Sequence, residues 1–156
     1  MQKKITRNPA VGLAGQEVAV GTAIYTPQNY LSDGTVYAGG FAFAGATTDD
    51  GEKFLVASAT GTGSVIGLVE RTITGALSVT EEGKEVFPKG DELSIARRGD
   101  YYVSATGVAT VGQAVLCDPA TGKVTYGAVG DANDTGWVVM SASTAEGDTI
   151  IVSNRG

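Results

Sequence analysis

The 156-residue sequence contains no histidine and only one cysteine, Cys117. Histidine is the commonest general base and metal ligand, so its absence excludes Ser-His-Asp and Cys-His catalytic groups. Zinc sites need several Cys or His ligands, which a single cysteine cannot supply. No disulfide can form within the chain, a composition typical of a reducing cytosol. We predict that Cys117 is an inert, buried core residue.

Long segments that could form a helix are also absent. Glycine accounts for 23 residues, and the longest segment free of both Gly and Pro covers ten residues, 137–146. A typical helix in a globular protein has about 11 to 12 residues. Val, Ile and Thr outnumber Leu and Met, and such β-branched residues favour a pleated surface. The composition therefore predicts an all-β fold and excludes helical bundles, coiled coils and doubly wound α/β folds.

No apolar run approaches the roughly 18 residues of a membrane-spanning helix. The first residues are basic, but no apolar stretch follows them as it does in a signal peptide. We therefore expect a protein that is made and kept in a cytosol and that has no membrane partner. The length suits one domain with a substantial core.

Charge is unevenly distributed along the chain. The formal net charge is −6, which argues against nucleic acid as a partner. Residues 1–16 carry Lys3, Lys4 and Arg7 and no acidic residue, whereas residues 17–156 carry 8 basic and 17 acidic residues, a charge of −9. We predict an N-terminal arm over 1–16 and a single all-β domain over 17–156. The arm is either a solvated terminus or a segment that contacts an acidic neighbouring surface.

No segment carries a cofactor or metal motif. Residues 61–67 contain three glycines but lack the spacing of a dinucleotide-binding fingerprint and the helix that it opens. Three carboxylates lie within an acidic turn at 47–52, without the ligand spacing of an EF-hand. The sequence predicts no cofactor, no metal site and no catalytic residue.

Turn signals recur about every 8–12 residues, the spacing of strands in a β-sandwich or barrel. Alternation and short apolar runs predict about ten strands and no internal repeat. They cover residues 17–22, 35–43, 53–59, 65–73, 92–98, 101–105, 113–117, 123–126, 137–142 and 149–152. We expect an antiparallel sandwich or a barrel-like, jelly-roll-like single domain of these short strands, preceded by an extended N-terminal arm.

Some local patterns make sharper predictions. The continuous apolar run 65–69 indicates a central strand covered on both faces. The glycines at 39–40 and Gly67 fall inside predicted strands, which indicates a bulge or a close packing contact. Residues 99–100 predict a turn between two strands, and residues 118–122 predict a five-residue hairpin loop.

The second half of the chain carries short phrases in a set order. A Gly-Leu-Val-Glu-Arg segment comes first, followed by a Pro-Lys-Gly turn, a Gly-Asp-Tyr-Tyr-Val strand and a Thr-Val-Gly-Gln segment. In order and spacing these phrases resemble the structural cement (head decoration) proteins of tailed bacteriophages. The resemblance spans residues 60–156 and, more weakly, 9–22. The segments that carry it are 67–71, 86–90, 93–96, 98–103 and 109–115.

The resemblance implies a β-rich structural protein without catalytic residues or cofactors. Such a protein binds the outside of an icosahedral phage head, associates with itself as a homodimer or homotrimer, and bridges neighbouring copies of the major capsid protein. It would stabilise the shell against internal pressure. It would be assembled in the host bacterial cytoplasm and end on the exterior of the virion.

Exposed aromatic residues are the expected anchors of such contacts, because Tyr and Trp are enriched at interface hot spots. Adjacent Tyr101 and Tyr102 point to opposite faces of a strand, so we expect one in the core and the other at the surface. The arm residues Lys3, Lys4 and Arg7 are further candidates. The candidate tyrosines are Tyr25, Tyr30, Tyr37 and one of Tyr101 or Tyr102.

Two other functions remain open. A non-catalytic β-sandwich module of a phage fibre or surface protein, which binds carbohydrate or a host surface, needs an exposed aromatic platform. Trp137 is the one tryptophan, and it lies within an apolar run. A hydrolase that uses carboxylates alone needs two of them about 5–10 Å apart across a cleft. No pattern pairs any of the 17 acidic residues in this way.

Overall fold

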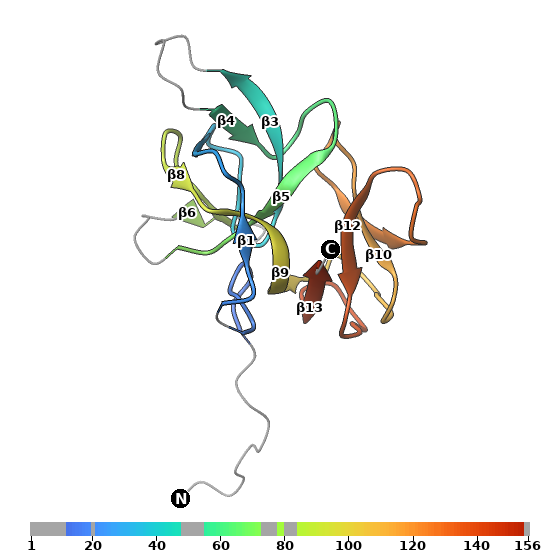
Figure 1. The fold of residues 1–156 in the computed structure, drawn as a ribbon. Coiled ribbons are helices and arrows are strands. Elements are labelled where there is room, and N and C mark those ends of the chain that lie inside the picture. The colour runs from blue at the N-terminus through green and yellow to red at the C-terminus, as the bar shows by residue number, and fades with distance from the viewer. Residues whose placement is uncertain (1–11, 20, 48–54, 73–77, 80–83, 155–156) are drawn as a thin grey trace, which may run out of the picture.

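The computed structural model describes residues 12–19, 21–47, 55–72, 78–79 and 84–154. Thirteen strands and no helix occur within these residues (Figure 1), so the predicted all-β fold class is confirmed. The strands missed by the sequence patterns include ones of only two residues, too short to show alternation. The strands are β1 (Ile24–Tyr25), β2 (Tyr30–Ser32), β3 (Phe41–Thr47), β4 (Leu55–Ser58), β5 (Val65–Val69), β6 (Ser78–Val79), β7 (Glu85–Val86), β8 (Glu92–Leu93), β9 (Ile95–Ser104), β10 (Ala114–Cys117), β11 (Val124–Gly127), β12 (Asp134–Val139) and β13 (Thr149–Asn154).

Eleven of the strands belong to one sheet, and β6 and β7 form a separate two-stranded sheet. Along the large sheet the order is β11-β10-β12-β13-β9-β5-β3-β4-β2-β8, with β1 also paired to β9. The pairing is antiparallel as predicted, except that β2 and β4 run parallel. β11 and β8 end this order without pairing to each other, so the sheet is open and does not close into a barrel.

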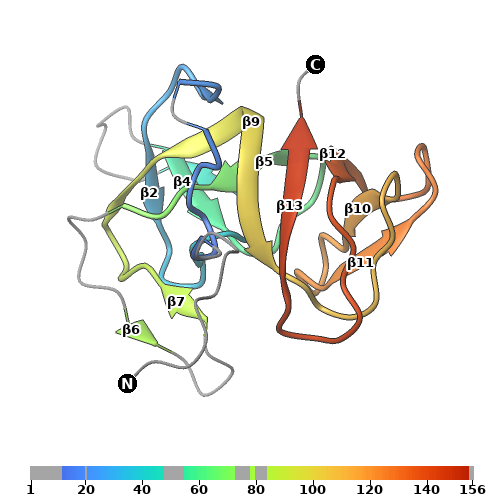
Figure 2. The same cartoon turned by 90° about the horizontal axis from the view of Figure 1, so that it is seen from below.

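β9 joins the two halves of this sheet. Figure 2 shows β10 to β13 together on one side of β9, and in the strand order β5, β3, β4 and β2 follow from its other edge. The first residues of β9 pair with β5 and β1, and its later residues pair with β13. The largest core cluster combines side chains of both halves, among them Leu68 of β5 and Ile150 of β13. The two halves therefore pack face to face in a sandwich-like arrangement.

Trp137 of β12 is at the centre of this core, with 1% of its surface exposed. Its ring meets Tyr101 of β9 edge to face at a centroid distance of 6.0 Å, and Phe41 of β3 at 6.4 Å. Each aromatic pair of this kind contributes about 0.5–1.5 kcal/mol beyond the area that it buries. Three rings from three strands thus hold the two halves together.

A second core lies against the other face of β3, β5 and β9. It contains Ala42, Val69 and Ile95, and it is closed by Val36 and Phe87 from the connecting segments. Neighbouring residues of one strand point to opposite faces, so β5 contributes to both cores. The prediction of a central strand covered on both faces is confirmed.

The chain continues as one strand through residues 99–100, so the predicted turn there is wrong. β9 runs for 10 residues without interruption. Gly99 has a φ of 133°, which residues with a side chain rarely adopt, and this lets the strand bend without ending. Asp100 is buried, and its carboxylate accepts a hydrogen bond from the Ser153 hydroxyl at 2.5 Å. Ser153 of β13 therefore provides a hydrogen-bond donor for the buried Asp100, a residue that the local sequence pattern predicts to lie in an exposed turn.

The predicted first strand over 17–22 is also wrong for its described residues. Glu17 forms only an isolated bridge, to Tyr101. Its carboxylate accepts hydrogen bonds from the N–H groups of Thr22 and Ala23, both at 2.9 Å. These bonds bend the segment into a loop, because a strand would carry residues 22 and 23 away from Glu17.

Of the other local predictions, the hairpin is confirmed, whereas the strand over 35–43 is confirmed only in its last residues. β10 and β11 form the predicted hairpin, and Asp118 holds its loop by accepting the N–H of Ala120 at 3.0 Å. The predicted strand over 35–43 begins only after the glycine pair, where β3 starts. A Cβ atom on Gly39 would lie 2.8 Å from the backbone nitrogen of Gly15, so a close approach explains that glycine.

Gly67 marks a second close approach, between β5 and β9. A Cβ atom at this position would lie 2.3 Å from the carbonyl oxygen of Ala96. Carbon and oxygen atoms cannot approach so closely, so a side chain here would force the two strands apart. The predicted packing role of Gly67 is therefore confirmed.

We expect Gly67→Ala to lower the free energy of unfolding by about 1–3 kcal/mol, the usual cost of overpacking. Gly107→Ala is the matched control, because an added Cβ there meets no atom within 4 Å. It should change stability by less than about 0.5 kcal/mol. Urea unfolding followed by tryptophan fluorescence measures both variants. Equal destabilisation by the two substitutions would contradict the close approach of β5 and β9.

Candidate interaction surfaces

The five candidate tyrosines differ in burial. Tyr101 and Tyr30 are buried, with 0% and 7% of their surface exposed, whereas Tyr25 is 43% exposed. Tyr37 and Tyr102 are half-buried. The prediction that one of the adjacent pair faces the core is confirmed, since Tyr101 belongs to the largest core cluster. Tyr30 and Tyr101 are core residues in this fold, and contacts by the other three tyrosines stay predictions.

The basic arm residues Lys3, Lys4 and Arg7 lie outside the described residues. The description begins at Gly12, which sits directly on the ring of Tyr102: a Cβ on Gly12 would lie 2.1 Å from a ring carbon. The arm therefore meets the body of the protein beside this half-buried tyrosine. The boundary of the arm at residue 16 stays a prediction.

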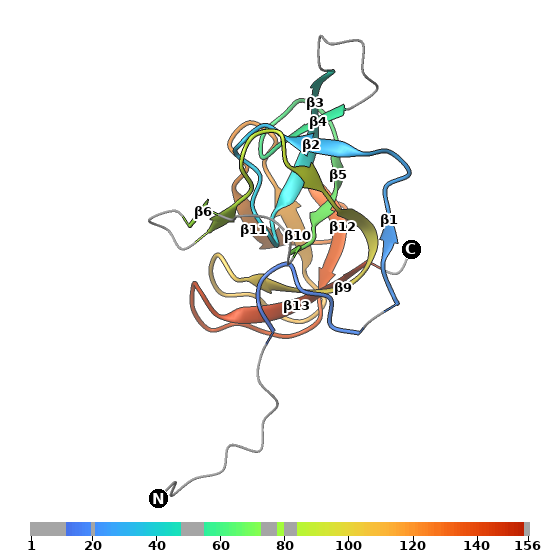
Figure 3. The same cartoon turned by 90° about the vertical axis from the view of Figure 1, so that its left-hand side faces the viewer.

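Residues 12–18, which we call the N-terminal segment, lie alongside the second half of β9 (Figure 3). Gly15 donates its N–H to the carbonyl of Tyr102 at 2.8 Å, and Tyr102 donates to the carbonyl of Gln16 at 2.9 Å. Gly15 also accepts the N–H of Arg71 at 2.8 Å, just beyond the end of β5. The N-terminal segment thus ties together elements from both halves of the sheet.

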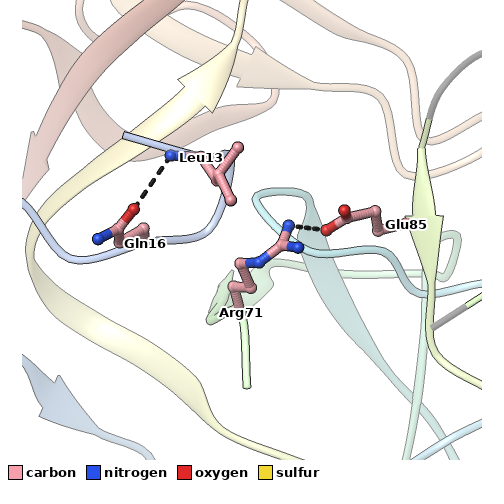
Figure 4. Close-up of polar contacts among 4 residues, drawn as sticks. All are labelled: Leu13, Gln16, Arg71 and Glu85. Carbon is pink, nitrogen blue, oxygen red and sulfur yellow. Dashed lines mark hydrogen bonds and ion pairs between the residues drawn. The ribbon is translucent and has the colours of Figure 1, made fainter. Parts of the chain in front are cut away.

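A cleft of about 810 Å³ opens next to the N-terminal segment. Leu13, Arg71 and Glu85 all line it, and Figure 4 shows Arg71 forming an ion pair with Glu85. Leu13 is 57% exposed, and its N–H donates to the Gln16 side chain at 3.1 Å. The ammonium of Lys84 lies 4.9 Å from the centre of the Tyr37 ring, a cation–π contact. The cleft offers an exposed leucine beside the Arg71–Glu85 ion pair.

Several exposed apolar residues were not predicted from the sequence, and three of them lie on neighbouring segments. Val108, Val111 and Met140 are 68%, 62% and 54% exposed. They lie on segments 108–112 and 139–143, which are hydrogen-bonded to each other at one end of β10 and β12. We call these three residues the rim patch. Exposed apolar residues on neighbouring segments are candidates for a contact surface.

Two carboxylates and a tyrosine form a partly buried polar cluster near β1. Burial raises the pKa of Glu70, the neighbouring Tyr25 hydroxyl opposes this rise, and repulsion from Glu17 adds to it. Burial and the nearby Glu70 side chain likewise raise the pKa of Tyr25. One carboxylate oxygen of Glu17 accepts hydrogen bonds from the backbone N–H groups of Thr22 and Ala23. The folded protein therefore holds Glu70 in surroundings that disfavour its charged form.

The described residues offer little reactive chemistry. Cys117 is buried as predicted, and burial raises the pKa of its thiol to about 11, which keeps it protonated and weakly nucleophilic at neutral pH. The described residues contain no group of three or more His, Cys, Asp or Glu that could hold a metal ion. Most of the acidic turn at 47–52 lies outside them. Within the same ranges there is no helix long and apolar enough to cross a membrane.

Comparison with known proteins gives a family and a fold. The family model described as "Structural cement protein (E217 gp24/Pam3 gp6)" matches residues 1–154. Among solved structures, a chain of "The capsid of Myoviridae Phage XM1" is similar with a TM-score of 0.57 and 15% sequence identity, over 99% of this chain and 98% of that chain. At this identity the likeness shows the fold alone. No curated protein sequence matches the chain.

We expect Glu70→Gln to stabilise the protein at neutral pH. The folded-state pKa of Glu70 is raised, so its charge costs stability above that pKa, and the cost disappears as pH falls to the unfolded-state value. The gain should stay below about 1 kcal/mol, because water screens a side chain that is only partly buried.

Thermal unfolding at pH 7 and near pH 4 measures this effect. The variant should be more stable than the wild type at pH 7, and the difference should shrink at the acidic pH. Glu92→Gln removes the same charge from an exposed position and serves as the control. An equal gain from both variants would show that net charge, and not the surroundings of Glu70, sets the effect.

Proposed function

The chain belongs to the structural cement protein family of phages, and on that premise we propose that it binds the outer surface of an icosahedral head. There it would bridge neighbouring copies of the major capsid protein and stabilise the shell against internal pressure. The observation that carries the proposal is the family match over residues 1–154, nearly the whole chain. A structural role in the capsid follows from the family, and the bridging is our inference.

The mechanism is adhesion through buried surface. A specific contact buries about 1,200–2,000 Å² in total, and repetition over many capsid sites makes attachment multivalent when neighbouring copies also touch. Self-association as a homodimer or homotrimer belongs to this proposal. Two packed cores that share β5 favour attachment through buried surface, because a well-packed body loses little conformational freedom on binding.

The placement in the virion is also a proposal. We infer that the protein is assembled in the host bacterial cytoplasm and ends on the outside of the head. A net charge of −6 makes the packaged nucleic acid an unfavourable partner. We propose neither a membrane partner nor a cofactor.

Several exposed groups could supply the contacts. Tyr25, Tyr37 and Tyr102 are each at least partly exposed, and Tyr102 lies where the arm meets the body. The rim patch adds aliphatic surface at another place on the molecule. We propose the arm, these tyrosines and the rim patch as the contact surface.

The alternative functions gain no support from the fold. A carbohydrate-binding module needs an exposed aromatic platform, and the one tryptophan, Trp137, is buried among other rings. A carboxylate hydrolase needs two free carboxylates across a cleft. Glu85 and Glu146 line the larger cleft, but Arg71 is ion-paired with Glu85. We therefore propose a non-catalytic protein.

The proposal predicts that the purified protein sediments with phage heads assembled without it. Decorated heads should also retain their DNA to a higher temperature than undecorated heads, because each bound copy must be released before its neighbours separate. Sedimentation followed by a thermal DNA-release assay measures both effects. Heads that leave the protein in the supernatant would overturn the proposed function.

Deletion of residues 2–8 should lower occupancy on these heads if the basic arm contacts the shell. The deletion removes Lys3, Lys4 and Arg7, so the remaining affinity should also depend less on salt. Thermal unfolding of the truncated protein should stay close to that of the wild type. Unchanged occupancy at low and high salt would exclude the arm from the contact.

A further inference from the structure

A second cleft, of about 410 Å³, lies near the first residues of β9. Arg97 and Arg98 of β9 line it, together with Thr135 of β12 and Asn154 at the end of β13. It therefore lies where strands from both halves of the sheet meet. The larger cleft is lined by Val103 and Ser104 at the other end of β9, so the two are separate sites.

The charge of this cleft is of one sign. No acidic residue lines it, although the chain has 17 acidic and 11 basic residues. Arg97 and Arg98 are exposed, and within the described ranges neither side chain forms an ion pair or a hydrogen bond. An acidic protein thus presents, at one cleft, two consecutive arginines whose side chains its own described residues leave unmatched.

Part of the remaining wall of the cleft is aliphatic. Ile24, Val65 and Ile66 line it, and Ile24 is 54% exposed. Backbone pairing places Ile24 of β1 directly opposite Arg98 of β9. A ligand in this cleft would meet cationic donors and aliphatic surface together, a combination that suits a side chain on a polypeptide better than a free anion.

We propose that this cleft receives an acidic segment of the shell protein, with carboxylates held by Arg97 and Arg98 and a neighbouring apolar group packed on Ile24 and Val65. The guanidinium group matches a carboxylate with two parallel hydrogen bonds, which fixes orientation as well as affinity. The inference rests on the proposed function and names one contact of it. It adds an attachment point on the folded body, separate from the arm.

A nucleic acid is the weaker alternative occupant. Protein–DNA interfaces neutralise many phosphates over a broad basic surface, whereas this cleft has two arginines on a chain with net charge −6. Its volume of about 410 Å³ is at the small end of the range for binding sites. One acidic segment of a folded partner fits these dimensions and this charge.

The test compares head binding by the wild type and by Arg97→Ala/Arg98→Ala over a salt series. Loss of a buried, charge-matched contact should weaken binding about 10- to 100-fold at low salt and flatten its salt dependence. Both arginines are exposed, so the melting temperature should not change. Arg97→Lys/Arg98→Lys keeps the charge without the planar fork and should restore only part of the affinity.

Lys89→Ala/Lys123→Ala is the matched control, because it removes two exposed cations elsewhere on the described surface. Equal losses for this pair and for the arginine pair would show that binding senses only net charge and would overturn the inference. So would unchanged head binding by Arg97→Ala/Arg98→Ala while the wild type binds. A wild type that fails to bind heads overturns the proposed function and the inference together. Retention of a short DNA duplex that is lost only in the arginine variant would assign the cleft to phosphate and overturn the inference.

Discussion

The backbone of β9 is hydrogen-bonded to strands of both halves of the sheet, and most other features of the protein depend on that continuity. Its first residues pair with β5 and β1, and its last residues pair with β13 and with the N-terminal segment. Tyr101, in the middle of the strand, reaches Trp137 in the core between the halves. The bend at Gly99 makes this possible, since it redirects the strand without breaking its hydrogen bonds. One strand therefore fixes how the two halves pack.

The position of β9 also accounts for the surfaces. The larger cleft and the arginine cleft lie toward opposite ends of the strand. The N-terminal segment lies along its second half, so the arm starts from a rigid part of the fold. Contacts made at these places would transmit force directly into the strand that holds the core together. The proposed stabilisation of the shell needs this coupling, because a contact on a loosely attached loop would yield before the shell did.

Sequence patterns correctly predicted the elements that are determined by residues close together in the sequence. The apolar run 65–69 and the hairpin loop 118–122 need only neighbouring residues to define them, and both were predicted correctly. Asp100 was misassigned because its hydrogen-bond partner, Ser153, is 53 positions away and only the folded sheet brings the two together. The consecutive arginines 97 and 98 can be read from the sequence. The cleft around them could not be predicted, because its other walls come from β5, β12 and β13, which are distant in the sequence. Met140 of the rim patch could have been found, since alternation from a buried neighbour places it outside.

The distribution of charge determines how strongly neighbouring copies of this acidic protein would repel one another on a shell. Copies that each carry a net charge of −6 repel one another, yet at physiological salt this repulsion fades over a Debye length of about 8 Å. Repulsion therefore acts mainly between surfaces in near contact, and there the local pattern matters more than the total. The basic arm and the arginine cleft concentrate positive charge at two places, while the rim patch is uncharged. An acidic body with a few cationic and apolar places is oriented by its own field, because its cationic places approach an acidic surface more favourably than its acidic places do.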